Sequence, residues 1–66
     1  MLIQLNGESR ELAEAATVAS LIDELGLAGR RLAVEVNEDI VPRSRHGELR
    51  LQAGDRVEVV HAIGGG

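Results

Sequence analysis

The sequence contains no cysteine, no aromatic residue and no lysine. Without cysteine, the chain forms no disulfide, binds no metal through thiolates and has no thiol nucleophile. Without Phe, Tyr or Trp, a hydrophobic core must be built from Leu, Ile, Val and Ala. The apolar fraction of 44% is nevertheless ordinary for a globular protein. A chain of 66 residues is long enough for one small domain, and we expect an aliphatic core.

The charge balance is acidic. All seven basic residues are arginines scattered along the chain, and the formal net charge is −4. Nucleic-acid binding needs a clustered basic surface, so this balance argues against it. The opening MLIQL lacks the basic start of a signal peptide, and no apolar run approaches membrane-spanning length. We expect a cytoplasmic protein that binds neither nucleic acid nor a membrane.

The first thirteen residues have the pattern of a β-hairpin. Residues 2–5 (LIQL) suit a strand, and Asn6-Gly7 is the strongest short hairpin signal. Residues 8–13 (ESRELA) then form the return strand, although their alternation is weak. A two-residue loop places Leu5 and Leu12 on one face, together with two charged side chains. A β-bulge would change that register, and the sequence leaves both open.

A short amphipathic helix is predicted over residues 17–25. Thr17 is a candidate N-cap. One apolar stripe follows from the spacing i, i+3, i+4 and i+7 of Val18, Leu21, Ile22 and Leu25. Gly26 stands where helices often end in a left-handed residue, and Leu27 is placed to fold back on Ile22 in a Schellman motif.

Three further short strands are predicted after the helix, over residues 32–37, 48–52 and 56–63, with a turn at 53–55. Pro42 limits how far any strand continues through EDIVPR. In the last strand, Val57 and Val59 are expected to face the core, which leaves Glu58, Val60 and Ala62 outward by the period of two.

This order of elements favours an α+β fold in which one mixed sheet packs against one short helix. A hairpin, a helix and then further strands is the order of the β-grasp, or ubiquitin-like, architecture. The first and last strands are the most apolar, so we expect them to pair in parallel at the centre of the sheet. We predict one β-grasp domain over residues 1–63 and a flexible glycine tail over 64–66.

Side chains that carry catalysis are not apparent. The phosphate-loop, zinc-protease and serine-hydrolase motifs are all missing. His46 and His61 are the only histidines, and solvated or packed side chains explain them better than a metal site. Glu38-Asp39 reads better as a solvated turn than as an acid–base pair. We expect no catalytic residue, no metal and no bound cofactor.

The C-terminal carboxylate is the reactive group that remains. At neutral pH it is an anion and a poor electrophile, but ATP-dependent adenylation would activate it. A partner enzyme must supply that step, because the chain shows no nucleotide site. Glycines have no Cβ and adopt φ of either sign, so Gly64, Gly65 and Gly66 would pass through a narrow active-site channel. An ordinary frayed terminus is the alternative interpretation of the same three residues.

Four stretches of the sequence resemble the ThiS family, the sulfur carrier proteins of thiazole (thiamin) biosynthesis. They are LNGE at 5–8, TVASLIDELGL at 17–27, LAVEVNEDIVPR at 32–43 and GDRVEVVHAIGGG at 54–66. The resemblance implies that a ThiF-like adenylyltransferase activates Gly66 with ATP and that a cysteine desulfurase supplies sulfur. Gly66 then carries a thiocarboxylate that donates sulfur to a ThiG-like thiazole synthase. The chain would be a protein co-substrate and not an enzyme, with Gly64 and Gly65 giving access.

Partner docking is expected at Val60, Ala62 and Ile63, an apolar patch beside the tail. Arg43 and Arg56 are further candidates for charged contacts, although solvated arginines are more common. Two alternative functions remain open. One is a carrier like the small subunit of molybdopterin synthase, which uses the same chemistry for another acceptor. The other is a non-covalent β-grasp interaction domain with an inert tail.

Overall fold

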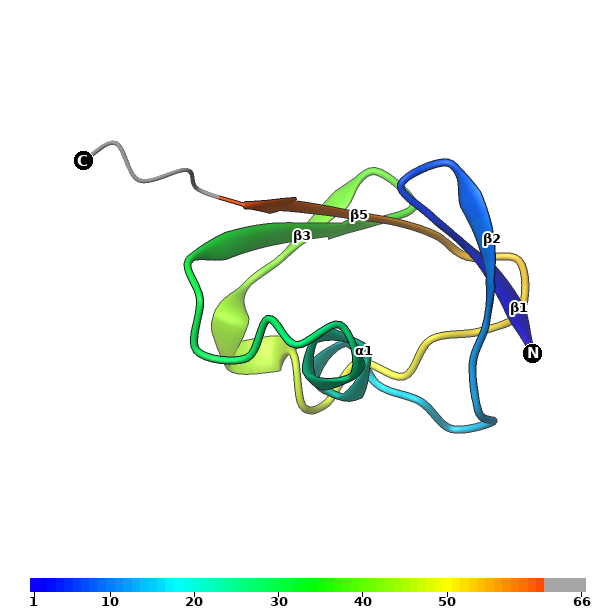
Figure 1. Ribbon diagram of the computed structural model, residues 1–66, viewed down its shortest axis with the longest axis horizontal. Coiled ribbons are helices and arrows are strands. Elements are labelled where there is room, and N and C mark those ends of the chain that lie inside the picture. The colour runs from blue at the N-terminus through cyan, green and yellow to red at the C-terminus, as the bar shows by residue number, and fades with distance from the viewer. Residues whose placement is uncertain (62–66) are drawn as a thin grey trace.

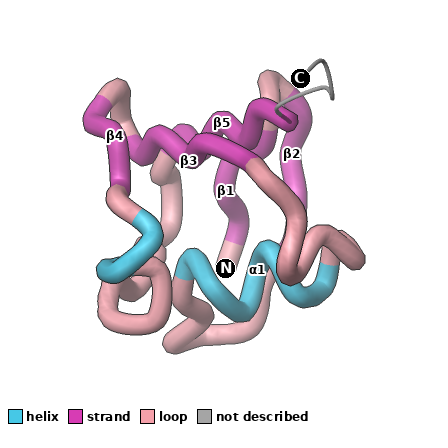
Figure 2. The backbone as a smooth tube through the Cα atoms, turned by 90° about the vertical axis from the view of Figure 1, so that its left-hand side faces the viewer, coloured by secondary structure: helices cyan, strands magenta, loops and turns pink. Residues whose placement is uncertain are grey.

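The computed structural model describes residues 1–61 of the chain. Five strands form one sheet, and a single short α-helix packs against one of its faces (Figures 1 and 2). The elements in chain order are β1 (Leu2–Leu5), β2 (Glu8–Glu11), α1 (Val18–Glu24), β3 (Leu32–Val36), β4 (Asp39–Val41), the 3₁₀ helix η1 (Arg43–Arg45) and β5 (Arg56–His61). This two-layer arrangement is the predicted α+β architecture.

The sheet is mixed, with the strand order β2-β1-β5-β3-β4. Strands β1 and β5 run parallel, and Leu5 lies opposite Val57. The pairs β1–β2, β3–β4 and β3–β5 are antiparallel. The prediction that the first and last strands pair in parallel is therefore confirmed, and β5 is the central strand.

The N-terminal hairpin has the regular register. Leu5 pairs with Glu8 and Leu2 pairs with Glu11, so only two residues form the loop. Those residues, Asn6 and Gly7, have φ angles of 50° and 84°. Two positive φ values are what a type I′ turn requires, and this turn matches the twist of the strands. No bulge is needed to place Leu12 in the core, because Leu12 follows β2 on the face of Leu5.

The helix α1 begins and ends at the predicted signals. Thr17 Oγ1 accepts a hydrogen bond from the Ser20 amide, and Ser20 Oγ accepts one from the Thr17 amide, which forms a capping box. At the other end, Gly26 has a φ of 73°. The Leu27 amide donates to Ile22 O at 3.0 Å and the Gly26 amide donates to Asp23 O at 3.0 Å. These two bonds form the predicted Schellman motif.

The prediction of a strand over residues 48–52 is wrong. This segment lies beside the chain that enters the helix and is not part of the sheet: Leu51 donates to Ala16 O at 2.8 Å, and Val18 donates to Leu49 O at 3.1 Å. Only one isolated bridge, Thr17 with Arg50, results. The alternation in the sequence reflects the burial of Leu51 and the half-burial of Leu49. It does not indicate which segment the backbone of residues 48–52 pairs with.

The fifth strand of the sheet is β4, which we did not predict from the sequence. Asn37 and Glu38 have φ angles of 53° and 74° and form a second two-residue turn, so Asp39 pairs with Val36. Pro42 then ends the strand, as expected from its missing amide hydrogen. The predicted strand over 56–63 corresponds to β5, whose described part ends at His61; residues 62 and 63 lie outside the described residues.

The core lies between the sheet and α1 and is aliphatic, as predicted. Val57 of β5 and Val34 of the neighbouring strand β3 are 1% and 0% exposed. Leu21 and Val18 cover them from the helix and are fully buried. The complete cluster is Ile3, Leu12, Ala16, Val18, Leu21, Ile22, Val34, Leu51 and Val57.

Candidate functional site

The end of the central strand β5 is where the predicted site begins. His61 pairs with Leu32 there, and this is the end of the sheet opposite the turn at Asn37 and Glu38. The described residues stop at His61. The predicted sulfur-carrying Gly66, the predicted access residues Gly64 and Gly65, and the predicted docking residues Ala62 and Ile63 lie outside them.

Val60 is the one predicted docking residue within the described part of the chain. It lies on the outer face of the sheet, directly opposite Ala33 of β3, and is 60% exposed. Val57 points into the core, and Val59 is half-buried on the same side. The predicted alternation of β5 is therefore confirmed through Val60. Val60 and the exposed Ala33 form a small apolar surface close to the end of the strand.

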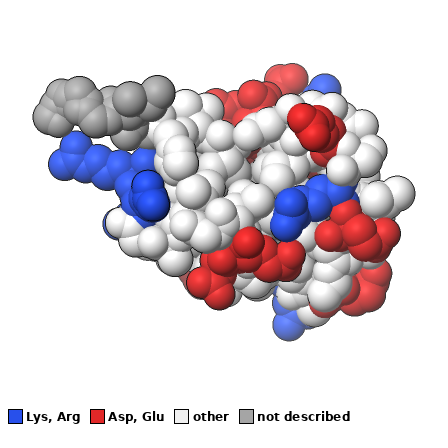
Figure 3. Space-filling view, in the orientation of Figure 1, with Lys and Arg blue, Asp and Glu red and all other residues white. Residues whose placement is uncertain are grey.

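A basic hollow of about 440 Å³ lies beside this apolar surface, at the end of β5. It is lined by Arg31, Leu32, Ala33, Arg43, Val60 and His61. Two arginines and a histidine therefore surround the end of the strand in a protein whose formal net charge is −4. Figure 3 shows arginine side chains gathered at the left of the molecule, the side toward which β5 runs in Figure 1. The charge complements an acidic rather than a basic partner surface.

Arg43 reaches this hollow because of the local chain path. Pro42, with a φ of −64°, ends β4 and precedes η1, so the chain turns at that point. The Arg43 guanidinium then donates a hydrogen bond to Arg30 O at 2.8 Å. Arg56 behaves differently, because it begins β5 at the other end of the sheet and lies 3.5 Å from Glu38 Oε2. Of the two arginines considered for partner contacts, only Arg43 lies near the end of β5.

The two histidines have different environments, and neither belongs to a metal site in the described part. His46 is buried, with its Nε2 3.1 Å from Val41 O, so packing rather than solvation explains it. His61 is exposed at the end of β5. Residues 1–61 contain no group of three or more His, Cys, Asp or Glu side chains placed to hold a metal. Within that same range, the only α-helix is far too short and polar to span a membrane.

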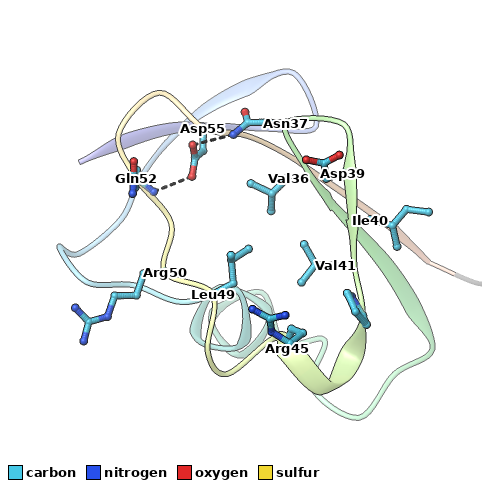
Figure 4. Close-up of a pocket in the computed structure, with 11 residues that line it drawn as sticks. Val36, Asn37, Asp39, Ile40, Val41, Arg45, Leu49, Arg50, Gln52 and Asp55 are labelled. Carbon is cyan, nitrogen blue, oxygen red and sulfur yellow. Dashed lines mark hydrogen bonds between the residues drawn. The ribbon is translucent and has the colours of Figure 1, made fainter.

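A second hollow, of about 420 Å³, lies at the opposite end of the sheet between β4, η1 and the segment before β5 (Figure 4). Part of its polar rim links the two turns that border it. The Asp55 carboxylate accepts hydrogen bonds from Asn37 Nδ2 at 3.0 Å and from the backbone N–H of Gln52 at 2.8 Å. Sequence reasoning did not identify this hollow, and no motif in the sequence points to it. These two hydrogen bonds stabilise the turns on either side of the hollow.

Comparisons with known proteins agree on one family. A model described as the ThiS family matches residues 3–66. The ThiS sulfur carrier of Bacillus subtilis is 32% identical over 66 residues, covering 98% of this chain and all of that protein. A crystal structure of the thiamine biosynthesis protein ThiS from Geobacter metallireducens superposes with a TM-score of 0.85 at 29% identity, with both chains covered completely. The predicted β-grasp fold is therefore confirmed.

Longer proteins also contain this sequence pattern. A thiazole synthase of Paramagnetospirillum magneticum is 42% identical over 66 residues. The match covers all of this chain but only 20% of that protein. This chain thus spans about a fifth of the length of that thiazole synthase, and the matched region is one part of a larger polypeptide there.

Proposed function

The chain belongs to the ThiS family, and from this premise we propose that it is the sulfur carrier for thiazole formation in thiamin biosynthesis. The observation that carries the proposal is the match to ThiS carriers along the whole chain, in sequence and in fold. The part that reacts is the C-terminal carboxylate of Gly66. The chain acts as a protein co-substrate, and its partners supply the catalytic groups.

Activation comes first. One oxygen of the Gly66 carboxylate attacks the α-phosphorus of ATP on a ThiF-like adenylyltransferase, which releases pyrophosphate and leaves an acyl-adenylate. The terminal sulfur of a persulfide, formed by a cysteine desulfurase, then displaces AMP from the carbonyl carbon. A thiol cleaves the resulting acyl disulfide, which leaves a thiocarboxylate on Gly66 and a new disulfide between the donor sulfur and the thiol. The need for ATP supports a cytoplasmic location.

In our proposal, the folded part of the chain docks to the partner enzymes, and the glycine tail carries the C-terminal carboxylate into their active sites. Val60 and Ala33 offer apolar surface beside the end of β5, and Ala62 and Ile63 extend it in our proposal. Arg31 and Arg43 add positive charge at the same end. Gly64 and Gly65 lack Cβ atoms, so they would pass through a channel too narrow for other residues. We assign residues 1–63 to the folded domain and 64–66 to the glycine tail.

A thiazole synthase is the partner that the comparisons support. Two proteins with that name contain a region 42% and 44% identical to this chain over 66 residues. A carrier domain joined to a synthase in one polypeptide indicates that the two work together. The adenylyltransferase and the desulfurase rest on the family resemblance alone.

Removal of Gly65 and Gly66 tests the proposal. A strain that depends on this chain for thiamin should lose growth without thiamin, because the carboxylate would no longer reach the partner active sites. The intact mass of the full-length protein from cells should show one oxygen replaced by sulfur, mapped to the last peptide. The truncated protein should keep the thermal unfolding curve of the full chain, since the core lies within the folded body.

Two outcomes would contradict the proposal. One is growth without thiamin after the truncation, which would favour a non-covalent interaction domain. The other is intact thiamin synthesis together with lost molybdoenzyme activity after deletion of the gene, which would assign the carrier to molybdopterin.

A further inference from the structure

The side chain of Asn6 continues the sheet beyond the end of β1. Strand β1 ends at Leu5, opposite Val57, and Asn6 begins the two-residue turn that leads into β2. The backbone N–H of Asn6 still donates to Val57 O at 2.9 Å. Asn6 Oδ1 then accepts a hydrogen bond from the Val59 N–H at 2.9 Å, and Asn6 Nδ2 donates one to Val59 O at 3.3 Å. A carboxamide has the donor and the acceptor of a peptide group, so this side chain replaces one further residue of the strand.

The last part of β5 is held from this side by Asn6. On its other side, β5 pairs with β3 as far as His61, which lies opposite Leu32. The register with β1 ends earlier, at Val57. Within residues 1–61, the Asn6 carboxamide is the single group that forms hydrogen bonds with β5 on the β1 side beyond Val57. Asn6 therefore restrains the strand close to the point where it leads into the glycine tail.

A second asparagine in a turn holds the opposite end of β5. Asn37 Oδ1 accepts a hydrogen bond from the Arg56 N–H at 2.9 Å, and Asn37 Nδ2 donates one to the Asp55 carboxylate at 3.0 Å. The φ angles of Asn6 and Asn37 are 50° and 53°, so the two residues have the same backbone conformation. The chain thus offers an internal comparison, because one residue type holds the start of β5 in one turn and its last part in the other.

We propose that Asn6 is a positioning residue for the sulfur-carrier reaction: by holding the last part of β5, it directs the Gly66 carboxylate into the active site of the adenylyltransferase. This rests on the function proposed above. Gly66 lies seven positions after Val59, and a fully extended chain of that length spans at most about 25 Å. Turning such a chain by ~10° at Val59 moves its end by about 4 Å. A misplacement of ~1 Å can lower the rate of a reaction about 100-fold, so the direction of β5 matters for the chemistry.

The test compares Asn6→Gly with the parent chain and uses Asn37→Gly as the matched control. Glycine adopts the positive φ of either turn, so each variant keeps its turn and loses the side-chain amide. Both substitutions increase the conformational entropy of the unfolded chain in the same way. Each also removes two side-chain hydrogen bonds. A loss of stability alone therefore predicts equal effects of the two variants on the reaction.

Two quantities are measured on the full chain, below its melting temperature. Amide hydrogen exchange is followed by NMR, and pyrophosphate release from ATP is followed with purified adenylyltransferase from the same organism at varied carrier concentration. In Asn6→Gly, the Val59 amide should exchange about tenfold faster while the Arg56 amide keeps its parent rate. The kcat should fall about tenfold. The KM for the carrier should stay within about twofold, because β3 still pairs with Val60 at the docking surface. Asn37→Gly should show the opposite exchange pattern and the parent kcat.

An equal fall in kcat in the two glycine variants would overturn the inference, because it would indicate general destabilisation. An unchanged kcat in Asn6→Gly despite faster exchange at Val59 would overturn it as well. The same holds for a Val59 amide that exchanges as fast in the parent chain as in the variant, and for a higher KM with an unchanged kcat. Failure of the proposed function looks different, because the parent chain itself would then support no pyrophosphate release and form no thiocarboxylate.

Discussion

The partner contact proposed at Val60 leads to a prediction whose magnitude can be worked out from the exposure of that side chain. Val60→Thr keeps the side-chain shape and the β-branch, so the free protein should lose almost nothing, because its hydroxyl stays in water. Burying a hydroxyl without a hydrogen bond costs about 1–3 kcal/mol in protein mutational data. Only the exposed 60% of the Val60 side chain is available to a partner. The expected loss of binding free energy is therefore about 0.6–1.8 kcal/mol. The dissociation constant of the synthase complex should rise about 3- to 20-fold.

The assay is titration calorimetry of the carrier into thiazole synthase, alongside thermal unfolding of the carrier alone. Leu2→Thr is the control. Leu2 is 56% exposed on the outer face as well, but it lies at the other end of the sheet, where its carbonyl oxygen accepts from the Gly54 amide. An unchanged affinity in Val60→Thr, or an equal loss in Leu2→Thr, would refute docking at the end of β5.

Two predictions concern the stability of the folded body. Gly26→Ala should lower the free energy of unfolding by about 1 kcal/mol, because its φ of 73° is strained for an L-residue although no atom lies within 4 Å of a new Cβ. Gly47→Ala meets equally open space and has no positive φ, so it should raise the urea midpoint slightly, because alanine restricts the unfolded chain. A similar loss of stability in both variants would contradict the argument from the left-handed φ of Gly26. Leu21→Ala removes a fully buried side chain and should cost about 2–5 kcal/mol. The total stability of 66 residues is about 3–10 kcal/mol, so calorimetry should show a much lower melting temperature, and a shift of only a few degrees would contradict the packing.

Local signals in the sequence were sufficient to locate the turn of the hairpin and the two ends of the helix, but they left the register of the hairpin open. Asn6-Gly7 predicts a two-residue turn because both residues tolerate positive φ, and the structure has that turn. Thr17 and Gly26 mark the two ends of α1 because their own chemistry satisfies the unpaired backbone groups there. These features depend on residues within one or two turns of each other, so composition and spacing are enough to predict them.

The second hairpin shows where this reasoning fails. Asn37-Glu38 forms a turn with the same positive φ values, but glutamate rarely adopts them, so the turn leaves no clear signal. The segment around Leu49 and Leu51 alternates like a strand, yet its backbone bonds to Ala16 and Val18. Alternation reports which side chains are buried. It does not report which segment the backbone pairs with, since that depends on residues more than thirty positions away.

The sequence by itself determined the aliphatic core, the helix caps and the alternation of β5, which follow from the chemistry of single residues or from short-range spacing. It also indicated the carrier family, but through the resemblance of four stretches to that family. Only the tertiary structure decided that β4 completes the sheet, that Arg43 and His61 border the same hollow, and that Asn6 reaches the backbone of Val59. Strand register brings together residues that are distant in the chain, and a shift of one residue would reverse every face. The charged contacts proposed for the partner therefore belong to the fold and not to any motif.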